Sequence, residues 1–189
     1  MCESKQMAEL KPYMTQAETA LFYTYCKTST AYFEFGCGGS TVFYNALGKP
    51  CKSVENNESW LNKVRPLVGP STELIYINTG PVKDYGNPVN PAKTTGFADY
   101  SLAFSRRHPE TDLVLIDGRF RVACALQVVL SGFSGTVLVH DAERLDYWQI
   151  FPFFTRIERV ENLVALRLKP TADLKEAAAL WETYKLNYK

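Results

Sequence analysis

The chain has 189 residues, of which 46% are hydrophobic and 22% are charged, and 21 Lys and Arg against 20 Asp and Glu leave a formal net charge of +1. These ordinary globular values exclude an intrinsically disordered chain. The balanced charge argues against a nucleic-acid-binding domain, which is usually strongly basic. No apolar run approaches the roughly 20 residues that span a bilayer, and the polar residues 1–12 contain no signal segment. We therefore expect one cytoplasmic domain over residues 1–189, without a membrane partner.

The first half of the chain alternates between helical and strand patterns. Thr15 and Glu18 have the spacing of a capping box, which predicts an N-terminal helix over residues 15–27. Strands are predicted at 31–35, 52–55 and 73–77, and the helices between them at 40–47 and 59–67. Residues 78–97 hold too many glycines and prolines for a regular element. A loop of this length in a compact domain is usually functional and often a lid, although it can also be a floppy surface loop.

The second half continues the alternation and then changes character. Helices are predicted at 99–107, 121–130 and 145–151, strands at 112–117 and 136–140, an antiparallel hairpin at 156–160 and 163–168, and a C-terminal helix at 171–187. This order predicts an α/β, Rossmann-like fold with helices on both faces of a seven-stranded, mostly parallel sheet, a core over residues 31–169 and a C-terminal antiparallel hairpin. The aromatic residues of 147–154 and Trp181 of the last helix suit the core or an oligomer interface.

The cysteines fit neither a disulfide framework nor a zinc site. They are an odd number, they are widely scattered, and no two of them form a C-x-x-C pair. We expect most of them to be reduced and buried, as small apolar residues. The five are Cys2, Cys26, Cys37, Cys51 and Cys124.

A glycine-rich turn follows the first predicted strand and opens the next helix. It reads Glu-Phe-Gly-Cys-Gly-Gly-Ser-Thr over residues 34–41. Glycines at such a turn allow positive φ and let a ligand approach the backbone. Ligands of open α/β sheets bind outside the carboxyl ends of the strands. A tight turn without any ligand is the structural alternative.

Two classes of nucleotide-type cofactor could bind at this turn, and one of them is the dinucleotides. The dinucleotide fingerprint G-x-G-x-x-G/A would need a small residue where Thr41 stands. Glu55 ends the second predicted strand, where a carboxylate can hold ribose hydroxyls in either class. Because both classes use such a carboxylate, Glu55 alone does not distinguish between them. Glu55 can also be a solvated strand-end carboxylate with no ligand.

These residues make the sequence similar to class I S-adenosylmethionine-dependent methyltransferases. The resemblance covers about residues 32–168 and rests on the glycine turn, on Glu55, on the strand ending at Asp117 and on the closing hairpin. More narrowly, Asp117-Gly118-Arg119-Phe120-Arg121 and Val139-His140-Asp141 resemble a small-molecule, sugar-type O-methyltransferase subgroup found beside glycan-building enzymes. The resemblance implies that S-adenosyl-L-methionine is bound by Glu34, Gly36, Cys37, Gly38, Gly39, Ser40, Thr41, Glu55 and Asp117.

The candidate catalytic residues end two neighbouring strands. Asp117 follows one strand, and His140 and Asp141 follow the next, so all three are expected to face one crevice. His140 can be the base that takes a hydroxyl proton, or it can simply hydrogen-bond a loop. Asp117 and Asp141 can instead hold Mg²⁺ or Mn²⁺. The catechol-type methyltransferases add an Asn to such a pair, whereas this chain has Ala142 there.

Four further residues are candidates for substrate binding. Arg119 and Arg121 have planar donor forks that suit a substrate carboxylate or phosphate, or an internal carboxylate such as Asp117. Tyr85 in the 78–97 segment and Tyr100 just beyond it can face a sugar or an aromatic acceptor when the segment closes.

The leading hypothesis is methyl transfer from S-adenosylmethionine to a hydroxyl of a small molecule, a sugar or glycan unit. Asp117 would lie nearest the reaction, and His140 or Asp141 would handle the proton. The alternatives are an NAD-type oxidoreductase or epimerase, and a non-catalytic binding module that keeps the fold for a partner.

Overall fold

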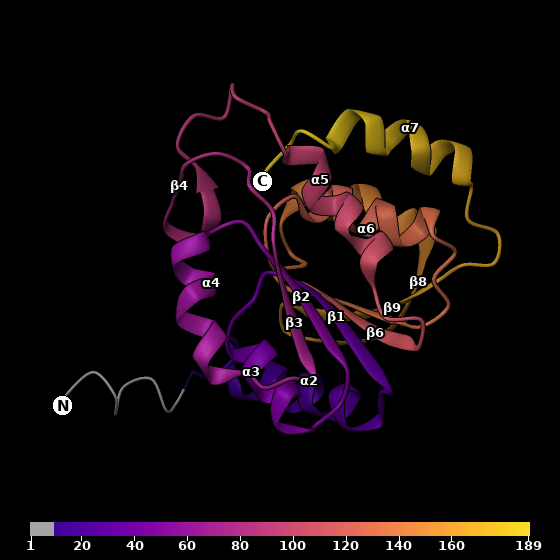
Figure 1. Ribbon diagram of the computed structural model, residues 1–189. Helices are drawn as coiled ribbons and strands as arrows, with labels where there is room; N and C mark the ends of the chain where they lie inside the picture. The colour runs from indigo at the N-terminus through magenta and orange to yellow at the C-terminus, as the bar shows by residue number, and fades with distance from the viewer. Residues whose placement is uncertain (1–9) are drawn as a thin grey trace.

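The computed structural model describes residues 10–189, and seven of its strands form one mixed sheet (Figure 1). The strand order is β3-β2-β1-β6-β7-β9-β8, in which β1, β2, β3, β6 and β7 are parallel and β9 runs antiparallel to both β7 and β8. The bounds are β1 Ala31–Phe35, β2 Cys51–Glu55, β3 Thr72–Tyr76, β6 Thr111–Ile116, β7 Thr136–Val139, β8 Phe154–Val160 and β9 Leu163–Leu168. The predicted Rossmann-like sheet with its C-terminal hairpin is confirmed.

Helices cover both faces of this sheet. In Figure 1, α2 and α3 lie on one side of the strands, and α5, α6 and α7 lie on the other. The α-helices are α2 Gln16–Thr28, α3 Gly39–Ala46, α4 Glu58–Val64, α5 Phe97–Leu102, α6 Arg121–Leu130 and α7 Leu174–Tyr184. Short 3-10 helices occupy Arg65–Leu67, Asp84–Gly86, Ala103–Arg106 and Leu145–Phe153.

The central strands are mostly apolar because each buries both of its faces, and Glu34 of β1 is a buried polar exception. Along β6, Leu113 and Leu115 pack with Phe22 of α2 on one side of the sheet. Val114 and Ile116 alternate with them and pack on the other side, against the cluster that contains α6. This period of two divides the core into two apolar layers with the sheet between them.

Five segments differ from the expectations, and one of them is the helix predicted at 99–107, which is α5 followed by the 3-10 helix Ala103–Arg106. The 78–97 segment is not wholly irregular, because β4 (Val82–Lys83) and β5 (Asn87–Pro88) pair in a small antiparallel hairpin. The helix predicted at 59–67 is α4 followed by a 3-10 turn that begins before Pro66. The helix predicted at 145–151 is a longer 3-10 helix, and the last helix is shorter than 171–187.

The expectation for the cysteines is met within the described residues. The four cysteines there, Cys26, Cys37, Cys51 and Cys124, are free and buried, whereas Cys2 lies outside the described residues. Across residues 10–189, every helix is too short or too polar to cross a membrane.

Candidate functional site

The glycine turn between β1 and α3 contains three glycines with different structural roles. Gly36 has a φ of +97°, and a Cβ on it would lie 2.6 Å from the Cα of Gly118. This position therefore needs glycine twice over, for its left-handed backbone and for the close approach of the β6 end. Gly39 is in contact with the Lys11 carbonyl, so a side chain there would collide with the N-terminal segment.

Gly38 is the glycine of this turn that faces open space. A Cβ on Gly38 would meet no atom of the described residues within 4 Å, and its φ of 175° is extended backbone that any residue can adopt. The protein itself therefore does not require glycine at this position. An approaching ligand would require it, because a side chain here would occupy the ligand's space.

Glu34 lies beneath the turn as a fully buried carboxylate. It accepts hydrogen bonds from the hydroxyls of Tyr32 (3.1 Å) and Ser53 (2.9 Å), and also from Ser40 and Thr41 at the start of α3. Burial raises its pKa to about 7, against the opposing effect of these four hydroxyls. The buried side of the turn is thus held by hydrogen bonds of Glu34 to Ser40 and Thr41. Thr41 Oγ1 also accepts the N–H of Gly38 at 2.8 Å.

Glu55 ends β2 beside the turn and is held by backbone groups. Its Oε1 accepts the N–H groups of Asn56 at 2.9 Å and Asn57 at 2.8 Å. Burial raises its pKa above the ordinary value, although the N–H groups of Asn57, Asn56 and Cys37 act in the opposite direction. Glu55 is therefore a rigidly positioned carboxylate, 7% exposed, next to the open side of the turn.

The ends of β6 and β7 bring together the three predicted catalytic residues. Asp117, His140 and Asp141 each offer a ligand atom within 4.8 Å of the others. Asp117 Oδ1 lies 3.0 Å from His140 Nδ1 and 3.2 Å from Arg121 Nη2. Arg121 Nη1 lies 3.0 Å from Asp141 Oδ2. The three residues therefore lie close together as expected, with Arg121 as the central cation of the cluster.

Arg121 is bound within the protein rather than free for a substrate. Its guanidinium donates to the carbonyls of Gly118 (2.9 Å), His140 (2.7 Å) and Asp117 (2.9 Å), in addition to the two carboxylates. Burial lowers the pKa of Arg121, but Asp117 and Asp141 raise it by more. Of the two roles considered for this residue, the structure shows the internal salt bridge.

A third acidic residue completes the surroundings of His140. Glu18 of α2 is 2% exposed, and its Oε2 lies 3.4 Å from His140 Nε2. Glu18 also accepts the N–H of Asn162 at 2.8 Å, in the turn between β8 and β9. Sequence reasoning assigned Glu18 to the capping box, which does form with Thr15, and gave no reason to look for a second partner.

Both ring nitrogens of His140 thus face carboxylates. Burial lowers its pKa, but the hydrogen bond to Asp117 and the charges of Asp117, Asp141 and Glu18 raise that pKa above the ordinary value. A histidine whose two ring nitrogens are both held by carboxylates suits the positioning of Asp117 better than the removal of a proton. Asp117 Oδ2, by contrast, makes no hydrogen bond within residues 10–189.

A divalent cation fits this cluster poorly. The Arg121 guanidinium lies within 3.2 Å of oxygens of both carboxylates that would have to bind the ion. Arg144 also pairs with Asp141 Oδ2 at 2.8 Å. A Mg²⁺ or Mn²⁺ ion would have to displace these guanidinium groups or lie beside them, and like charges repel strongly where water is scarce.

The predicted substrate-binding residues lie in three different environments. Arg119 is half-buried, and its Nη1 donates to Asn87 Oδ1 at 3.2 Å, at the small β4–β5 hairpin. Tyr85 is 82% exposed on that hairpin, with a φ of 59°. Tyr100 is buried, in contact with Gly118 and packed on Phe35 and Phe120. A direct role for Tyr100 would require movement of the core, so its role in binding stays a prediction, as does that of Tyr85.

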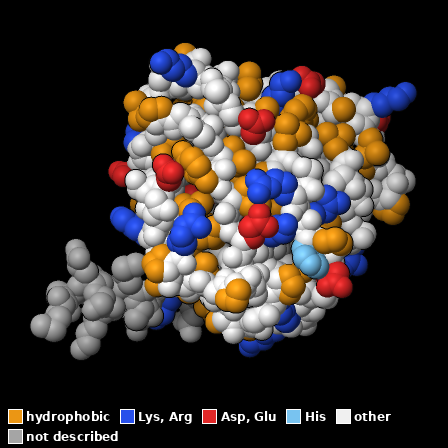
Figure 2. All heavy atoms as spheres, in the orientation of Figure 1, with side chains coloured by type: hydrophobic (Ala, Val, Ile, Leu, Met, Phe, Trp, Pro, Cys, Tyr) orange, Lys and Arg blue, Asp and Glu red, His pale blue; other side chains and the backbone are white. Residues whose placement is uncertain are grey.

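Charged side chains of both signs lie close together near the centre of the face in Figure 2.

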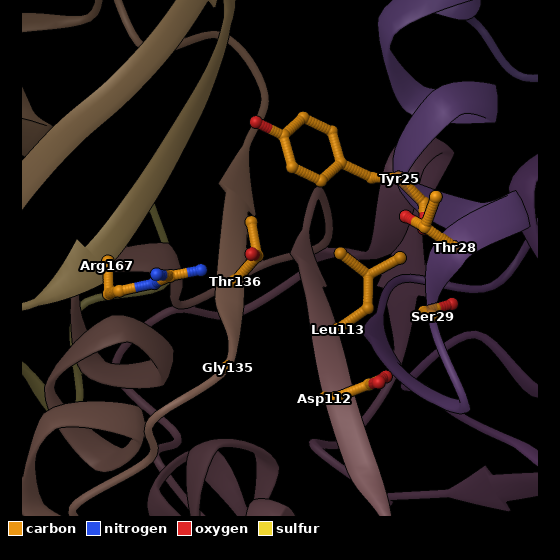
Figure 3. Close-up of a pocket in the computed structure, with 8 residues that line it drawn as sticks. All are labelled: Tyr25, Thr28, Ser29, Asp112, Leu113, Gly135, Thr136 and Arg167. Atoms are coloured by element: carbon orange, nitrogen blue, oxygen red, sulfur yellow. The ribbon is translucent and has the colours of Figure 1, made fainter.

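A hollow of about 220 Å³ lies at the amino-terminal edge of the parallel strands, opposite the edge that carries the predicted site residues. Figure 3 shows Arg167 reaching toward Thr136 across this hollow, with Tyr25 on its other side. Asp112 there accepts the N–H groups of Thr30 and Ala31, so its carboxylate holds the chain before β1. The predicted site residues do not line this hollow.

A solved structure resembles the chain over its full length. The crystal structure of a methyltransferase-like protein from Silicibacter pomeroyi has a TM-score of 0.84 and 29% sequence identity, and the match covers 97% of this chain and 100% of that one. No protein-family model and no curated protein matches the sequence.

Two further solved structures are more distant. The PH0226 protein from Pyrococcus horikoshii has a TM-score of 0.46 and 14% identity, over 84% of this chain and 94% of that one. A structure solved for the conversion of a disulfide bond into a thioacetal group during echinomycin biosynthesis has a TM-score of 0.47 and 12% identity, over 89% and 87%. Neither similarity bears on function, whereas the full-length match, the strand order and the closing hairpin support a class I methyltransferase fold for this chain.

Proposed function

We propose that the protein transfers a methyl group from S-adenosylmethionine to a hydroxyl of a small molecule, a sugar or glycan unit. The observation that carries the proposal is the pair formed by Gly38, which faces open space, and Glu55, which is held rigidly at the end of the neighbouring strand. This pair suits the approach of a cofactor backbone and the binding of ribose hydroxyls. The full-length similarity to a methyltransferase-like protein favours methyl transfer over hydride transfer.

The residues present fit such a cofactor. Gly36, Gly38 and Cys37 would offer backbone to it, and Glu55 would accept its ribose hydroxyls. When bound, S-adenosylmethionine supplies an activated methyl group on sulfur. Glu34, Gly39, Ser40 and Thr41 would act indirectly, because they shape the turn rather than face its open side.

Asp117 is the residue that we place at the reaction. Its Oδ1 is held by His140 and Arg121, which leaves Oδ2 to accept the proton of the acceptor hydroxyl. Oδ2 would take the proton that the acceptor hydroxyl gives up when its oxygen receives the methyl group. A positioned base of this kind contributes roughly 10²–10⁴-fold to the rate. Since Arg121 neutralises the carboxylates, we expect turnover to be unchanged in excess EDTA.

Calorimetry with S-adenosylhomocysteine tests the cofactor site. Wild type is expected to bind it, and Gly38→Ala and Glu55→Gln are each expected to weaken binding at least several-fold. Gly69→Ala is the matched control, because a Cβ on Gly69 would meet only Asn45 Oδ1, at an ordinary 3.6 Å. Absence of binding to wild type, or binding of NAD in its place, would contradict the proposal. A non-catalytic module would instead keep its biological activity in Asp117→Asn.

A further inference from the structure

Arg119 and Arg121 lie two residues apart but have opposite surroundings. Arg121 is paired with two carboxylates and three carbonyls. Arg119 has one side-chain hydrogen bond within residues 10–189, from Nη1 to the neutral amide oxygen of Asn87. Its Nε is buried and lacks a hydrogen-bond partner there. Across the described part of the chain, Arg119 also pairs with no carboxylate.

The backbone between the two arginines fixes this difference. Phe120 has a φ of 55°, which is rare for a bulky residue, and its ring is fully buried against Phe97 and Tyr100. On either side of Phe120, the side chain of Arg121 points into the acidic cluster and that of Arg119 points toward the β4–β5 hairpin. Left-handed residues of this kind are strained and are enriched at functional sites.

The guanidinium of Arg119 is in an unfavourable environment, because it is partly buried without a charged partner. Burial lowers the pKa of Arg119, and the neighbouring positive charge of Arg121 lowers it further. A buried donor without a partner loses its hydration without a compensating hydrogen bond. The nearby carboxylates of Asp117 and Asp141 are already paired with Arg121 and Arg144, and neither pairs with Arg119. Within the described residues the Arg119 guanidinium therefore has no counter-charge, and an anion would supply one.

We propose that Arg119 binds an oxyanion of the acceptor, a carboxylate or a phosphate, through its Nη groups. This inference rests on the proposed function and narrows its substrate class to acidic hydroxyl compounds, such as a sugar acid or a sugar phosphate. Arg119 is two residues from Asp117, so the acidic group would lie beside the hydroxyl to be methylated. The planar fork matches the two oxygens of such a group. The hairpin residues Gly86 and Asn87 would form the other wall of the subsite.

Nuclear magnetic resonance can test this site directly on the ¹⁵N-labelled full chain. The Nε–H resonance of Arg119 is assigned by its loss in Arg119→Lys, and the probes are inorganic phosphate and acetate, with chloride at equal ionic strength as the reference. We expect a saturable shift of the Arg119 resonance with phosphate or acetate, at a concentration at least tenfold below that at which chloride acts. Arg106 is the control, because it is half-exposed and already paired with Glu73. The more effective probe identifies the class of oxyanion.

The same titration is repeated with saturating S-adenosylhomocysteine. We expect the anion to bind as tightly as before, which places its subsite beside the cofactor. Loss of anion binding on addition of S-adenosylhomocysteine would assign Arg119 to the cofactor and overturn the inference. So would equal responses of Arg106 and Arg119, or equal effects of chloride and the oxyanions. If calorimetry finds no S-adenosylhomocysteine binding, the proposed function fails, whereas the anion titration still reports on Arg119.

Discussion

Glu34 is a fully buried carboxylate whose protonation should make stability depend on pH. Burial raises its folded-state pKa to about 7, from about 4.5 in the unfolded chain. Between these values the folded state binds the extra proton, so the contribution of Glu34 to stability is present at low pH and is lost as pH rises toward 7. The loss is on the order of 3 kcal/mol. We therefore expect the free energy of unfolding of wild type to fall, relative to Glu34→Gln, between about pH 4.5 and 7.

Urea unfolding of both proteins across that pH range gives the measurement. Because the slopes are compared, an absolute loss of stability in Glu34→Gln does not affect the result. Glu182→Gln serves as the control, since Glu182 is exposed and pairs only with Lys185. Parallel pH profiles for wild type and Glu34→Gln would show that Glu34 is ionised throughout.

Arg121 is the residue whose loss should cost the most stability in the charged cluster. It is 4% exposed and is the buried cation between Asp117 and Asp141. Arg121→Met would remove the guanidinium that pairs with both carboxylates. Breaking a buried ion pair in this way costs about 3–5 kcal/mol. Arg159→Met is the matched control, because Arg159 pairs with Glu143 on the surface, where such pairs contribute about 1 kcal/mol or less. Equal losses in urea unfolding would mean that Arg121 is not a structural cation.

Helix α2 links the N-terminal part of the chain to the charged cluster through Glu18. Thr15→Ala should cost about 1 kcal/mol by removing the helix cap and should leave His140 unchanged. Glu18→Gln keeps a residue that suits the capping box but removes the negative charge near His140 Nε2. We therefore expect Glu18→Gln, and not Thr15→Ala, to lower the pKa of His140. A ring-proton titration would show this, with the surface residue His108 as the internal reference.

At the level of elements, the sequence predicted what depends on local pattern. The apolar run of β6, the capping box of α2 and the alternation of strands and helices all leave a periodic or short-range signal. The strands therefore fell within a residue or two of their predicted bounds. The β4–β5 hairpin was missed because its two strands are two residues each, too short for any period. The end of α4 was missed because Pro66 converts its last turn to 3-10 geometry.

The candidate site was predictable in position but not in detail. Strand ends of a parallel sheet meet at one edge, so Asp117 and His140 were placed together from their order alone. Which carboxylate faces which ring nitrogen depends on contacts distant in sequence. Glu18 and His140 are such a pair, brought together by the packing of α2 on the sheet. The same limit applies to Gly36 and Gly38, which look alike in sequence and differ in what lies next to them.

For the whole molecule, the proposed function predicts a ligand-specific gain in thermal stability. A ligand present at 100 times its dissociation constant stabilises the folded state by about 2.7 kcal/mol. For a chain of this size, each kcal/mol corresponds to about 2–4 °C in Tm. We therefore expect S-adenosylhomocysteine to raise the Tm by about 5–10 °C, a gain that is unaffected by EDTA because Arg121 rather than a metal neutralises the carboxylates.

NAD at the same concentration should leave the Tm unchanged, because Thr41 fills the place of the third small residue of a dinucleotide turn and is tied to Gly38 and Glu34. Gly38→Ala should unfold at the Tm of wild type without ligand, since its methyl group enters open space, and should lose most of the gain with ligand. Gly36→Ala should instead lower the Tm without ligand, because its left-handed backbone and its contact with Gly118 both require glycine. A gain with NAD alone, or a Gly38→Ala variant that responds like wild type, would exclude the proposed cofactor site at this turn.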